Sequence, residues 1–193
     1  MTIENRVVFL VGKKTNLRPI KESEVPQITC WINDPEVRKY INNILPFTER
    51  QEMEWYKKLG SDEKNLILGI ETKEGKLIGT MGIHGIDPTH RCASTGTLIG
   101  EKSLWGNGFG SDAKMSLLYH AFYTMNLNKI NSSAFEFNER SIRYSLRCGY
   151  QIEGRRRAQF FREGRYWGIV LLGVIREEWI PLWEKYTTIG SLK

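Results

Sequence analysis

Three glycines spaced two residues apart are the strongest candidate for chemistry in this chain. Gly106, Gly108 and Gly110 lie in the run Trp105-Gly106-Asn107-Gly108-Phe109-Gly110-Ser111. A bound phosphate needs several backbone N–H groups converging on it, and glycines leave the backbone open to such an approach. A helix is expected to open near Ser111, with the positive end of its dipole facing the same anion. The run therefore predicts a phosphate-binding loop between a strand and a helix.

This loop has other interpretations, because a glycine-rich run alone can be an ordinary tight turn. The spacing Gly108-x-Gly110-x-x-Ala113 matches a dinucleotide-binding loop, which requires an acidic residue about 20 residues on, at the end of the next strand. Residues 128–133 contain no acid, and Glu136 lies beyond the expected position. No Gly-Lys-Ser/Thr follows, so a Walker loop does not fit. The sequence on either side of the loop is therefore needed to distinguish a plain turn from a phosphate-binding loop.

Length and composition indicate one globular domain over residues 1–193, with 40% hydrophobic residues. No apolar run approaches the ~20 residues that would cross a bilayer, so we expect a cytoplasmic protein without a membrane partner. Cys30, Cys92 and Cys148 are far apart. They predict neither a disulfide framework nor a metal site, and mostly buried, reduced thiols are expected.

The net charge of +6 is compatible with a polyanionic partner, and a coenzyme carrying three phosphates would suffice. Arg155-Arg156-Arg157 could be taken for a nucleic-acid patch. Successive residues on a strand alternate faces, however, so the three arginines cannot all serve one surface. We expect them to be solvated, or one of them to contact a cofactor phosphate.

The residues before the loop predict a helical N-terminal third followed by strands. Ser23 can cap a helix that Asp34-Pro35 ends, Asp34 can cap a short second helix, and Thr48 with Gln51 forms a capping box for a third. A first strand precedes these helices and ends near Pro19. Hydrophobic alternation then predicts strands over residues 66–71, 77–83 and 93–99.

After the loop, Ala113, Leu117, Leu118, Ala121, Phe122 and Met125 lie on one helical face. Residues 130–137 are strand-like, Asn138 can cap a helix that Gly149 terminates, and residues 152–161 and 166–175 form a closing hairpin. The order of helices, three strands, helix, strand, helix and hairpin indicates an α/β (α+β) domain with a mixed sheet.

With these segments in place, the chain resembles the GNAT superfamily of acetyltransferases, in the branch of ribosomal-protein and small-amine N-acetyltransferases. Three segments carry the resemblance. The first runs from Thr97 to Ala113 and is similar to the acetyl-CoA motif Arg/Gln-x-x-Gly-x-Gly/Ala, with Trp105 in place of the leading residue. The second runs from Asn138 to Tyr150. The third joins Gly164-Arg165-Tyr166 to the segment that ends at Trp179.

The resemblance implies a mixed, largely antiparallel sheet, splayed between the strand ending near Ile99 and the strand at 130–137, with acetyl-CoA in the gap. The backbone of Ile99, Gly100 and Glu101 would bind the pantetheine amides. Asn138 and Ser141 would face the pantetheine or phosphate arm. Taken alone, Asn138 is better read as a helix cap, and its position in the family motif favours the cofactor contact instead. The pyrophosphate would lie against Trp105, Gly106, Asn107, Gly108, Phe109, Gly110 and Ser111.

Transfer to an amine requires a deprotonated nitrogen, so a base is needed, and an acid can protonate the departing thiol. Candidate bases are Glu101, beside the cofactor, and His84, in the turn after the second hairpin strand, although each can also be a structural residue. The resemblance places the acid seven residues after Asn138, where this chain has Ser145. Tyr144 is adjacent, but one helical step rotates a side chain by about 100°.

These features predict acetyl-CoA-dependent transfer to a primary amine: a protein N-terminus, an amino sugar, a polyamine or an aminoglycoside. An acyl-CoA-binding module without catalysis is the alternative. Ser145 motivates it, as does Gly168, which stands where this branch often has Asp. A basic nucleic-acid-binding protein is a third hypothesis. Similar proteins are commonly dimers, so a homodimer is a further expectation.

Overall fold

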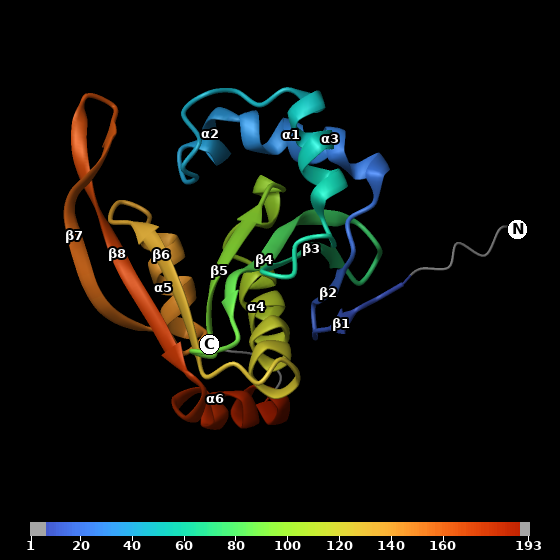
Figure 1. Ribbon diagram of the computed structural model, residues 1–193, viewed down its shortest axis with the longest axis vertical. Helices are drawn as coiled ribbons and strands as arrows, with labels where there is room; N and C mark the ends of the chain where they lie inside the picture. Colours follow the sequence, from blue (N-terminus) through green and yellow to red (C-terminus); the bar gives the residue numbers. More distant parts are fainter. Residues whose placement is uncertain (1–6, 190–193) are drawn as a thin grey trace, which may run out of the picture.

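Eight strands form one mixed sheet in the computed structural model, which describes residues 7–189 (Figure 1). The strand order is β1-β2-β3-β4-β5-β6-β8-β7, and every neighbouring pair is antiparallel except β5 with β6. The strands are β1 (Leu10–Val11), β2 (Thr15–Arg18), β3 (Asn65–Thr72), β4 (Leu77–Asp87), β5 (Cys92–Ile99), β6 (Lys129–Phe135), β7 (Gln151–Arg162) and β8 (Arg165–Ile175).

The parallel pair is short, and the sheet opens beyond it. Cys92, Ala93 and Ser94 of β5 pair with residues 129–131 of β6. Both strands then continue without pairing to each other, β5 as far as Ile99 and β6 as far as Phe135. Figure 1 shows the two strands diverging at this point. The predicted mixed, largely antiparallel and splayed sheet is therefore confirmed.

Six α-helices accompany the sheet in the described part of the chain. Their caps are mostly those that the sequence predicts: Asp34 accepts from the N–H groups of Glu36 and Val37, Thr48 forms its capping box with Gln51, and Asn138 accepts from Ser141. The helices are α1 (Val25–Asn33), α2 (Pro35–Arg38), α3 (Glu49–Lys58), α4 (Phe109–Tyr119), α5 (Glu139–Arg147) and α6 (Arg176–Ile189).

One prediction about helices is wrong, and one helix was not predicted. Ser23 does not cap α1, because it lies inside a 3-10 turn over Glu22–Glu24 and α1 begins at Val25, with Pro26 in its first turn. Proline suits that position, since the N–H it lacks has no partner there. The helix α6 was not predicted, and it contains Pro181 in its interior. Trp179 anchors α6, fully buried against Phe122.

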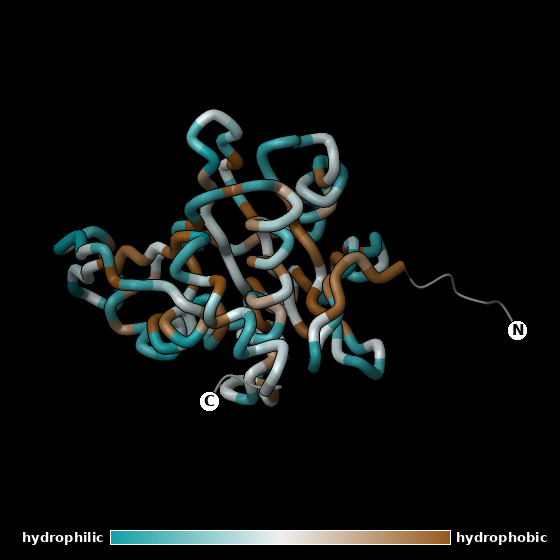
Figure 2. The backbone as a smooth tube through the Cα atoms, turned by 90° about the horizontal axis from the view of Figure 1, so that it is seen from below, coloured by the Kyte–Doolittle hydropathy of each residue, from teal (hydrophilic) through white to brown (hydrophobic). Residues whose placement is uncertain are grey.

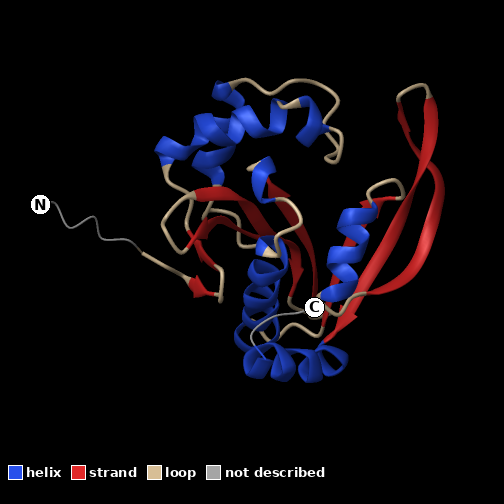
Figure 3. Ribbon diagram, turned by 180° about the vertical axis from the view of Figure 1, so that it is seen from behind, coloured by secondary structure: helices blue, strands red, loops and turns tan. Residues whose placement is uncertain are grey.

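The two faces of the sheet carry different cores. The larger core joins α4 to the strands and to α6, with Leu117, Phe122 and Ile130 at 0% exposure. The smaller joins α1 to the opposite face through Ile28 and Trp31. Hydrophobic and hydrophilic segments alternate along the backbone in Figure 2, and Figure 3 shows α4 against the sheet with α6 closing its lower end. The splayed strands therefore lie between two separately packed layers.

Asp112 fixes the start of α4 relative to the rest of the fold. Its carboxylate accepts from the backbone N–H groups of Lys13, Lys14 and Thr15 at 2.8–3.0 Å. The Thr15 hydroxyl (2.7 Å) and the Tyr186 hydroxyl (2.5 Å) also donate to it. A buried carboxylate is stabilised by this number of donors. The β1–β2 turn and α6 thus hold the helix end that carries the glycine loop.

Candidate acyl-CoA site

A cleft of about 980 Å³ occupies the opening between β5 and β6. Its wall includes Thr95, Thr97 and Ile99 from β5 and Ser132 and Phe135 from β6. Because β5 and β6 do not pair here, their facing backbone N–H and C=O groups are free of ladder bonds to each other. The cleft therefore offers a bound molecule strand-like hydrogen bonding along its length.

The glycine loop forms one end of this cleft. Gly106 and Gly108 have φ of 82° and 85°, a left-handed conformation that glycine adopts without strain. Gly108 is the N-cap of α4 and makes no side-chain cap bond, so the N–H groups of the first helical turn remain for another acceptor. A Cβ at Gly106 would meet no atom within 4 Å. The space in front of the loop is open and bordered by donors, which suits an anion.

Nine of the twelve predicted cofactor residues line the cleft, and three do not. Asn107 is exposed and accepts a bond from Lys14 Nζ at 3.1 Å through its carbonyl. Gly100 is buried against Trp31, where a Cβ would clash with the indole. Glu101 is described below. The lining residues are Ile99, Trp105, Gly106, Gly108, Phe109, Gly110, Ser111, Asn138 and Ser141.

Three arginines of α5 add positive charge to the wall, and sequence reasoning did not single them out. Arg140, Arg143 and Arg147 all line the cleft. The guanidinium of Arg140 lies 3.8 Å from the ring centroid of Trp105 and 4.9 Å from that of Tyr40. These arginines are spaced by three and four residues, which places their side chains on one helical face, and this pattern could have been recognised in the sequence. Phosphates at this end of the cleft would be surrounded by cations.

The two candidate bases differ in position. Glu101 bonds Lys76 at 2.6 Å and Ser103 at 2.8 Å, which lower the pKa of its carboxyl, and its side chain is not part of the cleft wall. His84 lines the cleft. A Cβ at Gly82 or Gly96 would come within 2.7 or 3.2 Å of its Nε2, so both glycines make room for the ring.

Burial lowers the pKa of His84, with a smaller contribution from the nearby charge of Lys114. The imidazole is therefore neutral at pH 7 and able to accept a proton. Of the two candidates, the structure brings only His84 to the cleft.

Comparison with known proteins bears on what such a cleft does. The sequence matches the acetyltransferase (GNAT) domain over residues 14–151, which is more than half of the chain. This protein belongs to the GNAT acetyltransferase family. It is a GNAT-type N-acetyltransferase, and enzymes of this family use an acyl-CoA donor.

Individual relatives agree with this assignment. The uncharacterized N-acetyltransferase p20 of Bacillus licheniformis is 29% identical over 88% of this chain and 97% of its own length. YdaF of Bacillus subtilis, named provisionally as a ribosomal N-acetyltransferase, is 28% identical over 76% of this chain and 75% of its own. The crystal structure of spermidine N-acetyltransferase from Vibrio cholerae, in complex with CoA and spermine, superposes with a TM-score of 0.80 at 22% identity. The match covers 86% of this chain and 98% of that chain.

The predicted acid of this GNAT enzyme, Ser145, does not reach the cleft. Its side chain is 1% exposed and is not part of the cleft wall. The neighbouring Tyr144 lines the cleft instead, with its hydroxyl 2.8 Å from Thr97 Oγ1. One residue along a helix turns a side chain by about 100°, so the two cannot face the same way. Burial raises the pKa of Tyr144 well above its usual value.

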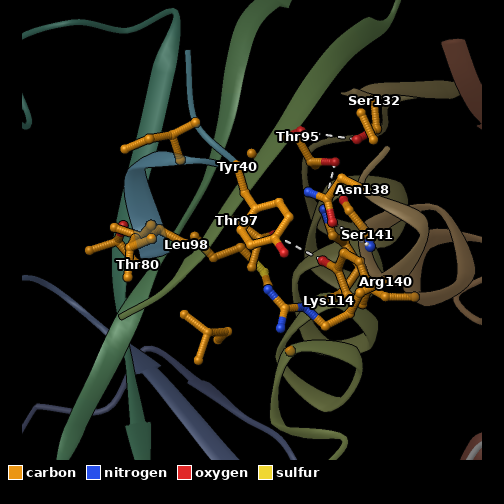
Figure 4. A pocket seen from close by; sticks show the side chains of 18 of the residues that line it. Tyr40, Thr80, Thr95, Thr97, Leu98, Lys114, Ser132, Asn138, Arg140 and Ser141 are labelled. Atoms are coloured by element: carbon orange, nitrogen blue, oxygen red, sulfur yellow. Dashed lines mark hydrogen bonds between the residues drawn. The ribbon is translucent and has the colours of Figure 1, made fainter. Parts of the chain in front are cut away.

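Lys114 is a further residue of this GNAT cleft that the sequence did not single out. It lies on α4, lines the cleft and is 1% exposed. Its Nζ donates to Thr95 Oγ1 at 2.7 Å, and Figure 4 shows both side chains among those lining the pocket. Its positions relative to Leu117 (i+3) and Leu118 (i+4) place it on the apolar helical face. A lysine among the apolar residues of this helical face was the feature of the sequence that could have pointed to it.

The cleft of this GNAT enzyme also differs from the expected site in its carboxylate side chains. Among the described residues that form its wall, none is Asp or Glu. Gly168 replaces an expected Asp, and the carboxylate of Glu136 accepts the Gly168 N–H at 2.7 Å, yet Glu136 is not part of the wall.

Some features are absent from the described residues. Within residues 7–189, no group of His, Cys, Asp or Glu could hold a metal ion. No helix in that part of the chain is long and apolar enough to span a membrane. Cys148 is buried and Cys92 half-buried, whereas Cys30 is exposed, so the expectation of mostly buried thiols holds only in part.

Proposed function

We propose that this GNAT enzyme transfers an acetyl group from acetyl-CoA to a primary amine that carries no second positive charge, such as the N-terminus of a polypeptide. The observation that carries the acceptor class is the charge of the cleft wall. It contains Lys114 and three arginines of α5, and no carboxylate among the described residues. A polyamine or aminoglycoside would bring several cations to a wall without acids, which is electrostatically unfavourable.

We place the acceptor on the side of the cleft away from the glycine loop, where the side chains of Tyr40, Asn42, Trp55, Thr80 and Phe160 are aromatic or uncharged. Arg140, whose guanidinium lies 4.9 Å from the Tyr40 ring centroid, borders this side. Aromatic rings and amide groups bind peptide backbone and apolar side chains without requiring charge. This composition supports an acceptor whose only cation is the reacting amine.

The donor would lie along the opening between β5 and β6. We propose that the β5 edge near Ile99 binds the pantetheine amides and that the glycine loop with the first turn of α4 binds the diphosphate. The positive φ of Gly106 and Gly108, the open space at Gly106 and the nearby Lys14 Nζ, which a Cβ at Gly108 would approach to 3.6 Å, support this placement. The Asn138 side chain accepts from Ser141 as a helix cap, so its contribution is to hold the start of α5 beside the donor.

His84 would remove the proton from the acceptor ammonium. It projects from β4 on the same face as Gly82, opposite to the face on which Met81 and Thr97 lie, because side chains alternate along a strand. That face is the one covered by α1 and α3. Bound acetyl-CoA supplies the activated acyl group as a thioester, whose C–S bond breaks when the amine forms an amide bond. The neutral imidazole Nε2 accepts the proton that must leave before the nitrogen can attack.

A panel of acceptors tests this proposal, with acetyl-CoA as donor and CoA release as the readout. Peptides with a free N-terminus should have a kcat/KM at least about tenfold above those of spermidine and an aminoglycoside. The same peptide with a blocked N-terminus and an internal lysine is the matched control. If spermidine is the best substrate, the acceptor assignment is wrong.

An added carboxylate tests the charge argument directly. Asn42→Asp places an acid in the cleft wall and should raise spermidine turnover relative to peptide turnover. Asn128→Asp is the control, since Asn128 is exposed and outside the wall. Equal effects of the two substitutions would contradict the argument.

A further inference from the structure

Lys114 is a buried cation at the apex of the opening between β5 and β6. Its Nζ donates to Thr95 Oγ1, and Thr95 directly follows Ser94, the last β5 residue paired with β6. Ser132 Oγ donates to the Thr95 carbonyl at 3.4 Å across the same point. The amino group therefore lies where the two strands part, on the α4 side of the sheet, in contact with the cleft.

The packing of the fold does not require a lysine at position 114. Within residues 7–189, no carboxylate lies within ion-pair distance of Lys114 Nζ, and Thr95 Oγ1 is its hydrogen-bond acceptor. The rings of Tyr144 and Tyr150 lie 5.5 and 5.6 Å away and give weaker cation–π contacts. A buried ammonium without a counter-ion is costly, and methionine would fill the same volume without that cost. The amino group is retained at a loss of stability.

The surroundings leave Lys114 close to its titration point at neutral pH. Burial lowers its pKa to about 7. Burial also raises the pKa of Cys148 to about 12 and those of Tyr144 and Tyr150 above their usual values, and it lowers the pKa of His84. These four neighbours are uncharged at pH 7. Lys114 is therefore the member of this group that can both hold and release a proton there.

We propose that Lys114 donates the proton that the sulfur of CoA takes up as the thiolate leaves. This inference rests on the proposed function and names the acid of the same reaction. The amide C–N bond forms and the C–S bond breaks, with its electron pair staying on sulfur. The acceptor ammonium loses two protons: the first passes to His84 and from there to solvent, and the second leaves the nitrogen as the amide forms. The ammonium of Lys114 gives its proton to the sulfur, and the second proton from the nitrogen restores that ammonium through solvent. Nothing is oxidised or reduced.

Lys114 suits this role better than either neighbouring hydroxyl. A thiol has a pKa of about 8.5, so a cation of lower pKa transfers its proton to the thiolate downhill. The Tyr144 phenol is a weaker acid than a thiol, because burial raises its pKa further above 10. Ser145 does not line the cleft. His84 and Lys114 would thus work from opposite faces of the sheet, one on the acceptor amine and one on the leaving sulfur.

The titration of bound CoA tests the proposal without relying on turnover. The ultraviolet absorbance of the thiolate reports the pKa of the CoA thiol in the complex. The thiolate and the Lys114 ammonium would stabilise each other, so in wild type the thiolate should begin to form close to the pKa of Lys114. In Lys114→Met the thiol should titrate about one unit or more higher than in wild type. Lys185→Met, an exposed lysine on α6, is the control and should leave it unchanged.

Lys114→Arg separates a proton donor from a fixed charge. Arginine keeps the cation and so should keep the lowered thiol pKa, but it does not release its proton. We expect kcat to fall about 100-fold in both Lys114→Met and Lys114→Arg. An arginine variant as active as wild type would overturn the role as donor. An unchanged thiol titration in Lys114→Met would show a merely structural residue.

Two further outcomes are distinguishable. A wild-type complex in which the CoA thiol titrates at or above its free value overturns the proposal even if neither variant folds. If wild-type protein binds no CoA at all, the proposed function itself fails. If Lys114→Met binds CoA and turns over like wild type, only the role of Lys114 fails.

Discussion

The two halves of the cleft are built in different ways. The donor half is formed by segments close together in sequence: the Trp105–Ser111 loop, the start of α4 and the arginines of α5 lie within about one quarter of the chain. The acceptor half combines segments far apart in sequence, including the loop after α2, the strand β4 and the β7–β8 hairpin. Local backbone geometry determines the first half, whereas tertiary packing determines the second. Substitutions in the two halves should therefore have separable effects.

The largest effect is expected in the donor half from Gly108→Asp. The substitution introduces a carboxylate beside the N–H groups of α4, where we place a phosphate, at a residue whose φ is 85°. Like charges brought together cost several kcal/mol, so acetyl-CoA should bind about 1,000-fold more weakly by calorimetry. Gly164→Asp is the matched control, at φ 78° with open space around it, in the β7–β8 turn. Retained binding in Gly108→Asp would remove the loop from the donor site.

His84→Gln should lower kcat/KM for the amine about 100-fold while acetyl-CoA binding stays unchanged. The base must be neutral to accept a proton. The acidic limb of the wild-type pH profile should therefore lie below pH 6.5, since the pKa of His84 is lowered from that value, and it should disappear in the variant. His120→Gln is the control, because His120 is also half-buried with a lowered pKa but lies outside the cleft wall. Equal losses in both variants would contradict the assignment.

Lys114 should leave a signature in stability as well as in catalysis. Its folded pKa of about 7 lies below its usual 10.5, so between these values the unfolded chain binds the proton and the folded chain does not. The free energy of unfolding should therefore rise with pH by about 1.4 kcal/mol per unit across this window, relative to Lys114→Met. Chemical denaturation of both proteins from pH 7 to pH 10 measures the difference. If the free energy of unfolding changed with pH in the same way in both proteins, the pKa of Lys114 would not be lowered in the folded state.

The smallest effect is expected in the acceptor half, from Arg162→Gln. The guanidinium of Arg162 on β7 donates to the carbonyls of Arg38 at 3.1 Å and Ile41 at 2.5 Å, which ties the hairpin to the loop after α2. Losing these bonds should raise KM for the amine roughly fivefold. Arg157→Gln, an exposed position on the same strand, is the control. If the acetyl-CoA affinity falls instead, the two halves are not separable.

The same contrast explains how much could be predicted from the sequence. The helix caps Asp34, Thr48 and Asn138 and the splayed sheet follow from local patterns and from the family resemblance. The position of Gly100 outside the cleft wall could not be predicted, because its contact with Trp31 joins distant segments. The burial of Ser145 could not be predicted either, because a motif position gives no side-chain direction. Lys114 was overlooked because its role depends on what surrounds it in three dimensions. The homodimer stays a prediction.

Thermal unfolding with and without acetyl-CoA tests the central claim most directly. Ligand at 100 times its dissociation constant should stabilise wild-type protein by about 2.7 kcal/mol, and Gly164→Asp equally, whereas Gly108→Asp should show no shift at the same concentration. If neither acetyl-CoA nor CoA at millimolar concentration raises the wild-type Tm, the cleft between β5 and β6 is not an acyl-CoA site.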